Sequence, residues 1–127
     1  MRLLLDTHIF IWWDRQLRRV PSEVRVVIED ASNEIFVSAA TVWEIAIKRR
    51  TGKLVFPVPV VAAIDRMGFQ LLPIDGAHTE HAGGLPRHHG DPFDRLLVAQ
   101  AMLQGLALAT LDPQMRPYGV PLLGLAQ

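Results

Sequence analysis

The residues in this sequence that could do chemistry are carboxylates that follow short apolar runs. Asp6 comes directly after the run 3–5, and Asp112 comes shortly after the run 106–109. Such runs are typical of buried strands, and in α/β sheets ligands bind at the carboxyl ends of the strands. The alternative is that each aspartate only caps the next turn or helix. Because two such acids end two strands, we favour a shared site at this edge.

Two further acids lie on predicted helices. Asp94 belongs to the segment 92–104, which is apolar on nearly every side and is therefore expected to be buried. A buried carboxylate needs a cation or hydrogen-bond donors, or else it takes up a proton. Glu44 borders the predicted apolar stripe of its helix, which consists of Ala39, Val42, Trp43, Ala46 and Ile47. The alternative role for Glu44 is a surface ion pair with Lys48.

Four carboxylates that converge on one sheet edge cannot all stay ionised without a compensating charge, because each raises the pKa of its neighbours. A divalent metal ion supplies that charge. Oxygen ligands favour Mg²⁺ or Mn²⁺ over zinc or copper, and the lack of cysteine excludes a zinc–thiolate site. Such ions activate water and neutralise charge on a phosphoryl group. The four acids therefore predict phosphodiester hydrolysis.

The elements that must position these acids follow from the pattern of apolar residues. Short apolar runs alternate with longer segments of helical periodicity, and the runs are 3–5, 35–37, 69–72, 106–109 and 120–123. Parallel strands covered by helices produce this alternation. The predicted fold class is therefore α/β.

Capping residues mark three of the predicted helices. Ser38 and Asp91 can accept hydrogen bonds from the first turn of a helix, and Pro21 and Pro92 suit a first helical position. Gly52 and Gly105 are placed to end helices. The predicted helices are about 21–31, 38–52 and 91–104, and the predicted loops are 53–59 and 83–90.

Composition excludes several classes of protein. The 127 residues include 13 Lys+Arg and 13 Asp+Glu, so a uniformly basic nucleic-acid binder and an acidic disordered chain are both excluded. Half of the residues are hydrophobic, as in globular domains, and the length predicts a single domain over 1–127. No apolar run approaches the roughly 20 residues that span a bilayer, and no signal-peptide pattern is present. We expect a soluble, cytoplasmic protein without a membrane partner.

Four segments together resemble the PIN domain, and most closely the VapC-type toxins of bacterial and archaeal toxin–antitoxin pairs. The segments are Leu4-Leu5-Asp6-Thr7-His8, 38–45, 89–101 and Ala109-Thr110-Leu111-Asp112. They occur in family order and at family spacing, and they are specific only in combination. The resemblance implies a Rossmann-like α/β/α sandwich with a central, mostly parallel sheet of about five strands. It also implies an endoribonuclease that depends on Mg²⁺ or Mn²⁺.

The resemblance assigns roles by motif position. The catalytic and metal-binding acids are expected to be Asp6, Glu44, Asp94 and Asp112. Asp6 and Asp94 are the expected direct metal ligands, whereas Glu44 and Asp112 are expected to act through water or on a second ion. Thr110 is expected to orient Asp112, and Asp91 either stands beside the site or only caps its helix. Together the acids would position water for in-line attack on a phosphodiester.

Partners are also implied by the resemblance. They are an RNA substrate, a cognate VapB-type antitoxin, a second copy in a homodimer, and a toxin–antitoxin hetero-oligomer. Trp12 and Trp13 point about 100° apart on a helix, so one of them is expected at an interface. The basic residues 48–50 and Lys53 either complement the end of their helix or contact an RNA backbone.

Two other functions compete with a ribonuclease toxin. A phosphatase of the haloacid dehalogenase type also begins with Asp after its first strand, but its second Asp is replaced here by His8. A noncatalytic PIN-like module that binds RNA or protein is the second alternative, and the intact set of four acids argues against it. The remaining histidines lack a third clustered ligand, so we expect loop or surface roles for His88 and His89.

Overall fold

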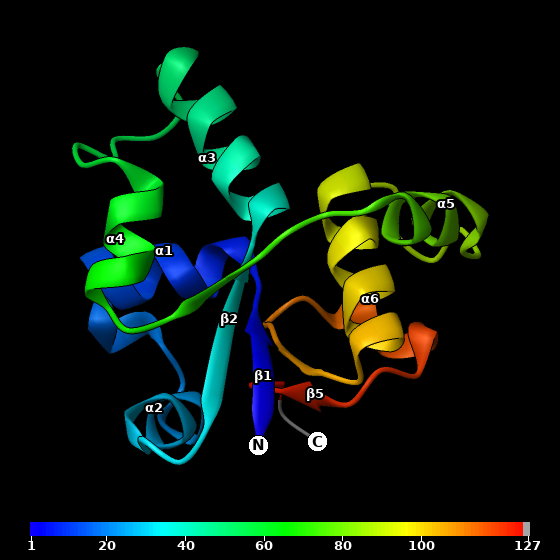
Figure 1. The fold of residues 1–127 in the computed structure, drawn as a ribbon, viewed down its shortest axis with the longest axis horizontal. Coiled ribbons are helices and arrows are strands. Elements are labelled where there is room, and N and C mark those ends of the chain that lie inside the picture. Colours follow the sequence, from blue (N-terminus) through cyan, green and yellow to red (C-terminus); the bar gives the residue numbers. More distant parts are fainter. Residues whose placement is uncertain (126–127) are drawn as a thin grey trace.

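A parallel sheet with helices on both of its faces forms the centre of the structure, a computed structural model that describes residues 1–125 (Figure 1). The strand order is β3-β2-β1-β4-β5, and every neighbouring pair is parallel. The strands are β1 (Arg2–Leu5), β2 (Glu34–Ser38), β3 (Gln70–Leu72), β4 (Ala107–Ala109) and β5 (Leu122–Leu123). The predicted α/β class and sheet of about five strands are therefore confirmed.

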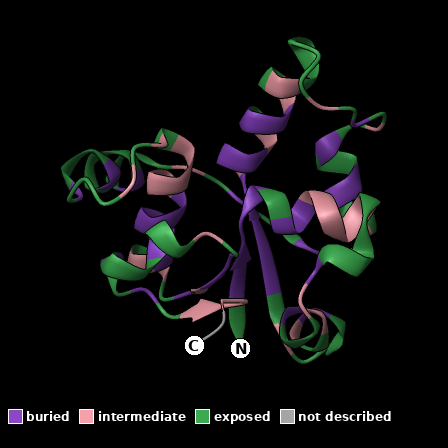
Figure 2. Ribbon diagram, turned by 180° about the vertical axis from the view of Figure 1, so that it is seen from behind, coloured by how far each residue is buried: buried purple, intermediate pink, exposed green. Residues whose placement is uncertain are grey.

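The apolar run of β1 reflects its place at the middle of the sheet. Leu3 and Leu5 point to one face and Leu4 to the other, and all three side chains are fully buried. On the first face they pack with α1 (Thr7–Arg15), α2 (Ser22–Glu29) and α4 (Val60–Arg66). On the second face α5 (Gly76–Gly84) and α6 (Pro92–Gln104) complete the core. Figure 2 shows the buried residues concentrated in the strands and on the inner sides of these helices.

The helix that carries Glu44, α3 (Ala39–Arg50), projects beyond the carboxyl edge of the sheet (Figure 1). The prediction that the apolar stripe of α3 is its buried face is wrong, because Trp43 and Ile47 in that stripe are 61% and 40% exposed. The residues that α3 buries are Ala40, Thr41, Glu44 and Ile45. The buried face includes two polar residues because they hydrogen-bond to α1, a contact that a count of apolar positions does not detect.

The helix starts agree with the predicted caps, whereas one predicted loop is partly helical. The side chain of Ser38 accepts a hydrogen bond at the start of α3, and that of Asp91 does so at the start of α6. Gly105 adopts the left-handed conformation that ends α6. The first two residues of the predicted loop 83–90 belong to α5, which ends at Gly84. A capping box between Asp75 and His78 stabilises the start of this glycine-containing helix. In the part of the chain described, no helix is long and apolar enough to cross a membrane.

A buried contact ties together the two helices that carry acids. Ser38, at the end of β2, caps α3 through Ala40 N and donates a hydrogen bond to Gln100 Oε1 on α6. Both side chains are fully buried. The contact therefore sets the position of α3 relative to α6.

Replacing Ser38 by alanine should lower the free energy of unfolding by about 2 kcal/mol, because a helix cap is lost and the buried Gln100 loses a donor. Urea denaturation followed by circular dichroism measures this change. Ser22→Ala, in the exposed first turn of α2, is the control and should change stability by less than about 0.5 kcal/mol. Equal stabilities of the two variants would contradict the structural role of Ser38.

Candidate functional site

Two of the four acids lie at the carboxyl ends of adjacent central strands. Asp6 follows β1, and its Oδ1 accepts a hydrogen bond from Ile9 N at 2.9 Å, so it caps α1. Asp112 follows β4 and accepts from Gln114 N at 2.9 Å, so it caps the short 3-10 helix η2 (Pro113–Tyr118). The two interpretations of these aspartates are thus compatible. Each acid caps the next element, and the cap fixes its carboxylate at the sheet edge.

Thr110 connects these two acids. It is fully buried between them, and its Oγ1 accepts a hydrogen bond from Asp112 N at 3.0 Å. Burial raises the pKa of the Asp6 carboxyl, and a hydrogen bond from the Thr110 side chain opposes that rise. A single hydroxyl group therefore positions one acid through its backbone and stabilises the charged form of the other.

Asp94 lies on the first turn of α6 and faces the other acids. Its pKa is raised to about 7, first because burial removes water from the carboxylate, then because the charge of Asp91 repels it. Asp6 and Glu44 raise the pKa further, whereas His89 lowers it. The charges of Asp91, Asp6 and Glu44 therefore all act on Asp94, and a positive charge placed among them would lower its pKa.

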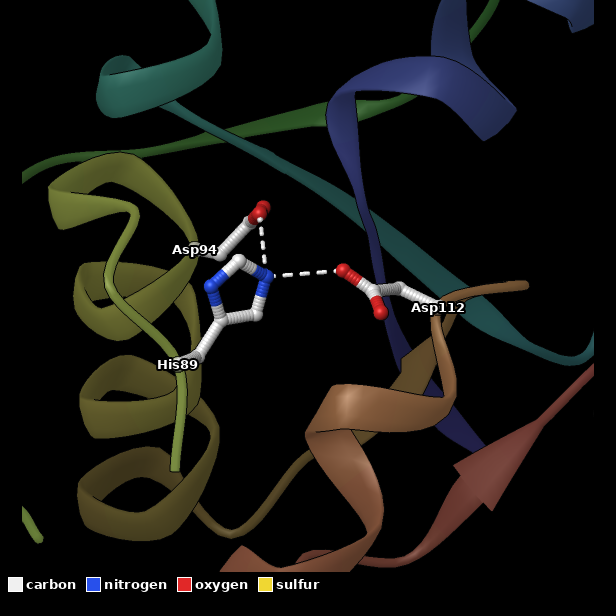
Figure 3. Close-up of side chains that lie close together, drawn as sticks. All are labelled: His89, Asp94 and Asp112. Carbon is white, nitrogen blue, oxygen red and sulfur yellow. Dashed lines mark hydrogen bonds and ion pairs between the residues drawn. The ribbon is translucent and has the colours of Figure 1, made fainter. Parts of the chain in front are cut away.

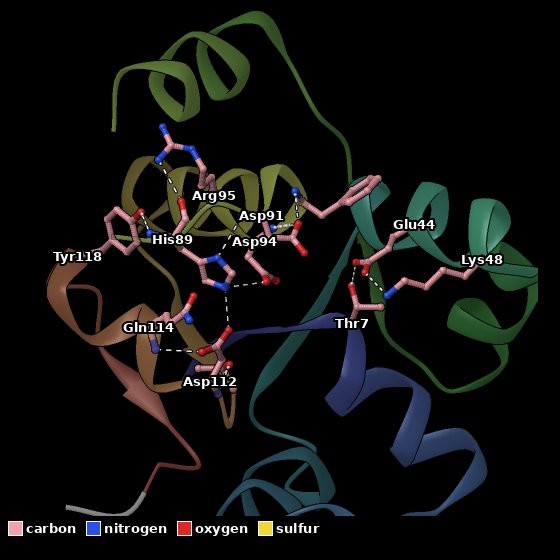
Figure 4. Close-up of polar contacts among 12 residues, drawn as sticks. Thr7, Glu44, Lys48, His89, Asp91, Asp94, Arg95, Asp112, Gln114 and Tyr118 are labelled. Carbon is pink, nitrogen blue, oxygen red and sulfur yellow. Dashed lines mark hydrogen bonds and ion pairs between the residues drawn. The ribbon is translucent and has the colours of Figure 1, made fainter. Parts of the chain in front are cut away.

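Glu44 is held on the opposite side of the site from Asp112 (Figure 4). It is 5% exposed, and its Oε1 accepts a hydrogen bond from Thr7 Oγ1 at 2.7 Å. Its Oε2 forms an ion pair with Lys48 Nζ at 2.7 Å. The Glu44–Lys48 ion pair that was the alternative role for Glu44 is therefore present. It is not a surface pair, because the Glu44 carboxylate is buried and only Lys48 is partly exposed. Thr7, which sequence reasoning missed, directly follows Asp6 and turns with α1 towards α3.

His89 lies in the loop before α6, as one of the two expected roles had it, but it bridges two of the acids, so the surface role is wrong. Its side chain is 11% exposed, and Nε2 lies 2.7 Å from Asp112 Oδ2 and 3.1 Å from Asp94 Oδ2 (Figure 3). The other ring nitrogen, Nδ1, accepts a hydrogen bond from Asp91 N. Nδ1 is therefore unprotonated, so the ring hydrogen sits on Nε2 and points to the carboxylates. No pattern of neighbouring residues indicates this role, because Asp112 lies 23 positions away in the chain.

The loop that carries His89 is held through its backbone. Arg95 donates hydrogen bonds to four carbonyl oxygens, those of Ala82, Leu85, Pro86 and His89. Tyr118 Oη accepts from His89 N at 3.0 Å and donates to Pro86 O at 2.8 Å. Figure 4 shows both side chains beside the histidine. The imidazole is thus positioned by side chains from α6 and η2.

Asp91 caps the start of α6, which is one of the two roles expected for it. Its Oδ1 accepts hydrogen bonds from Phe93 N at 2.8 Å and Asp94 N at 3.3 Å. Its charge also raises the pKa of Asp94, so it stands close to the site. Asp91 therefore shapes the local charge while its oxygen is engaged with the helix start.

The donor set of this site fits a hard divalent cation. Donor atoms of His89, Asp94 and Asp112 lie within 4.8 Å of one another, and Asp6 and Glu44 are close enough to shift the pKa of Asp94. Carboxylate oxygens suit Mg²⁺ and Mn²⁺. Because Nε2 of His89 carries the ring hydrogen, the carboxylates of Asp94 and Asp112, rather than this nitrogen, would hold the ion. Asp6 and Asp112 are among the residues that line a surface hollow of about 410 Å³, so the site opens to solvent on this side.

The fold is an α/β/α sandwich with acids at the carboxyl edge of its sheet, which is the arrangement expected for the PIN domain. The chain belongs to the PIN domain family, whose profile matches residues 3–120. The resemblance inferred from four motifs is thus confirmed, and the phosphatase alternative has no support.

Two relatives come from Mycobacterium tuberculosis. Ribonuclease VapC16 is 45% identical over 71 residues, which make up 51% of this chain and 50% of that protein. Ribonuclease VapC22 is 29% identical over 122 residues, which make up 94% of this chain and 93% of that protein. The match to VapC16 therefore spans only half of its length, whereas the match to VapC22 spans nearly all of it.

Solved structures share the fold. DNA-bound VapBC from Salmonella typhimurium superposes with a TM-score of 0.70 at 19% identity, with 97% of each chain covered. VapBC-1 from nontypeable Haemophilus influenzae gives a TM-score of 0.66 at 19% identity, also with 97% of each chain covered. At these identities the likeness shows the architecture alone.

The raised pKa of Asp94 makes the metal-free protein sensitive to pH. The folded state keeps the proton up to about pH 7, whereas the unfolded state releases it near 3.8, so stability falls as the pH rises through this window. Asp94→Asn removes the buried charge and should raise the free energy of unfolding at pH 8 by about 2–4 kcal/mol. The gain should shrink towards pH 5. Urea denaturation in EDTA measures it, and a gain that is the same at both pH values would contradict the shift.

His89→Ala should lower the free energy of unfolding by about 1–3 kcal/mol, because two partly buried carboxylates lose a shared donor. His88→Ala is the matched control, since His88 is exposed and its ring packs edge-on against the Tyr118 ring. Chemical denaturation in EDTA at pH 8 compares the two. If both variants matched the wild-type protein, His89 would not be positioning the acids.

Proposed function

We propose that this chain is a divalent-metal-dependent endoribonuclease that acts as the toxin of a VapBC-type toxin–antitoxin pair. The observation that carries the proposal is the convergence of four acids at the carboxyl edge of the sheet, namely Asp6, Glu44, Asp94 and Asp112. Burial and mutual repulsion raise the pKa of two of them, Asp6 and Asp94. The ribonuclease names of two relatives from the same family support RNA as the substrate.

Asp6 and Asp94 are the proposed direct ligands of Mg²⁺ or Mn²⁺, and Glu44 and Asp112 contribute directly or through water. When bound, the ion would activate water and neutralise charge that develops on the phosphoryl group. The proton and the cation compete for Asp94, because its pKa lies at about 7. Metal affinity should therefore be greater above neutral pH.

The chain's own residues keep the oxygen atoms in place for this chemistry. Thr110 positions Asp6 and Asp112, while Nε2 of His89 holds the facing oxygens of Asp112 and Asp94. Lys48 neutralises part of the charge of Glu44. These contacts exist before any substrate binds, so the site would not need to reorganise when charge develops on the phosphodiester.

A protein partner is part of the proposal. The related solved structures include VapBC assemblies and a toxin–antitoxin complex from Klebsiella pneumoniae. On this chain Trp43 and Ile47, four residues apart on α3, are 61% and 40% exposed. Exposed apolar side chains that lie together are typical of a protein contact. A cognate VapB-type antitoxin and a second copy of the chain are the proposed partners.

Asp6→Asn and Asp94→Asn should each reduce metal-dependent RNA cleavage by at least about 100-fold, because each removes a charged oxygen from the site. Gel assays of labelled RNA with Mg²⁺, Mn²⁺ or EDTA measure this loss. Asp65→Asn, on the exposed side of α4, is the control and should cleave normally. Circular dichroism establishes that the variants are folded.

Cleavage that survives in the Asp94→Asn variant would contradict the assignment of the site. A wild-type protein that binds RNA but cleaves none with either metal would favour the noncatalytic PIN-like module instead. Sequencing of RNA ends after induced expression would then identify the cleaved RNA if the enzyme is active.

A further inference from the structure

A basic pocket opens between α1, the 3-10 helix η1 (Leu17–Arg19) and the segment that follows α3. Its volume is about 500 Å³, within the range of roughly 300–1,000 Å³ that is usual for small-ligand sites. Four of its lining residues are basic, Arg15, Arg19, Lys48 and Lys53, and none is acidic. We refer to it as the basic pocket. Its charge favours an anionic occupant.

The basic pocket adjoins the acidic site. The hollow that reaches Asp6 and Asp112 is also lined by His8, Trp12 and Arg19, and the same three residues line the basic pocket. The two depressions therefore share a wall. A strand whose phosphodiester lay at the acids would extend directly into the basic pocket.

The shared wall has an aromatic surface. The Arg19 Cζ atom lies 4.3 Å from the centre of the Trp12 ring, and the His8 ring centre lies 5.8 Å from it. Trp12 is only partly buried, so its ring is accessible from the pocket. Bases of single-stranded nucleic acids stack on aromatic rings and on arginine planes in this way.

Two of the four cations form ion pairs with carboxylates, whereas Arg19 donates a hydrogen bond to the neutral side chain of Gln16 at 3.2 Å. Arg15 pairs with Asp14 at 2.8 Å, and Lys48 pairs with Glu44 at 2.7 Å. Arg19 and Lys53 are exposed and line the pocket from different elements, Arg19 from η1 and Lys53 from the segment after α3. These two side chains are therefore the best placed to contact phosphate groups.

We propose that the basic pocket binds an unstacked nucleotide of single-stranded RNA next to the phosphodiester that lies at the acids. The base stacks on Trp12, and Arg19 and Lys53 bind the flanking phosphates. This inference rests on the proposed ribonuclease function, since that function places RNA at the adjoining acids. A duplex would bind poorly, because its paired bases cannot enter the pocket. The excess of cations favours RNA over a protein segment.

Fluorescence anisotropy with a labelled single-stranded RNA of mixed sequence tests the pocket. The Asp94→Asn background prevents cleavage, and titrations run at several KCl concentrations. Arg19→Glu and Lys53→Glu should each raise Kd about tenfold or more and reduce the slope of log Kd against log salt by about 0.7. Trp12→Leu should raise Kd about fivefold or more without changing that slope, because it removes stacking and no charge.

Arg18→Glu is the matched control, since Arg18 neighbours Arg19 on η1, is also exposed and lines neither depression. It should bind RNA like the parent protein. Arg19→Met removes the charge without reversing it, and circular dichroism establishes that each variant is folded. The same sequence as a duplex should bind more weakly than the single strand.

The proposal is overturned if the Arg19, Lys53 and Trp12 variants bind RNA like Arg18→Glu. That result would favour a protein segment, rather than RNA, as the occupant of the basic pocket. Failure of the proposed function looks different, because a chain that binds RNA through the pocket but cleaves none retains all three binding defects. Conversely, a cleaving enzyme whose pocket variants bind normally retains the function and loses this inference.

Discussion

Repulsion between carboxylates at the carboxyl edge of the sheet is the constraint on which this structure depends. Burial raises the pKa of Asp6 and Asp94, and the neighbouring acids raise that of Asp94 further. The fold offsets this cost with local donors, from backbone N–H groups, Thr110, Thr7, Lys48 and His89. The site is therefore held in a state that a divalent cation would stabilise, and the surrounding elements keep it from relaxing.

Helix starts provide much of this restraint. Asp6, Asp91 and Asp112 each cap the element that follows them, so an aspartate at the end of a strand gains donors as soon as the next helix begins. A role in the site and a role as a helix cap therefore do not exclude each other at these three positions. Local structure and the acidic site require the same residue.

The sheet, and the places of Asp6 and Asp112 at its carboxyl edge, were predictable because they depend on short-range patterns. Apolar runs indicate the strands, and an acid after a run indicates the sheet edge. The contacts of His89 and Thr7 were not predictable, because they join loop, strand and helix across 23 and 37 positions of the chain. The buried face of α3 was missed for the same reason, since hydrogen bonds to Thr7 select it over the more apolar side. The zero net charge likewise conceals an acidic site beside a basic pocket.

The backbone contacts of Arg95 and Tyr118 have a consequence for how this surface can vary. Both side chains bind main-chain atoms of the segment 82–89, and main-chain atoms are the same for every amino acid. Arg87 and His88, which are exposed in that segment, can therefore change identity while the path of the chain is preserved. The rim of the site can diversify in charge and shape, and the imidazole beside it keeps its place.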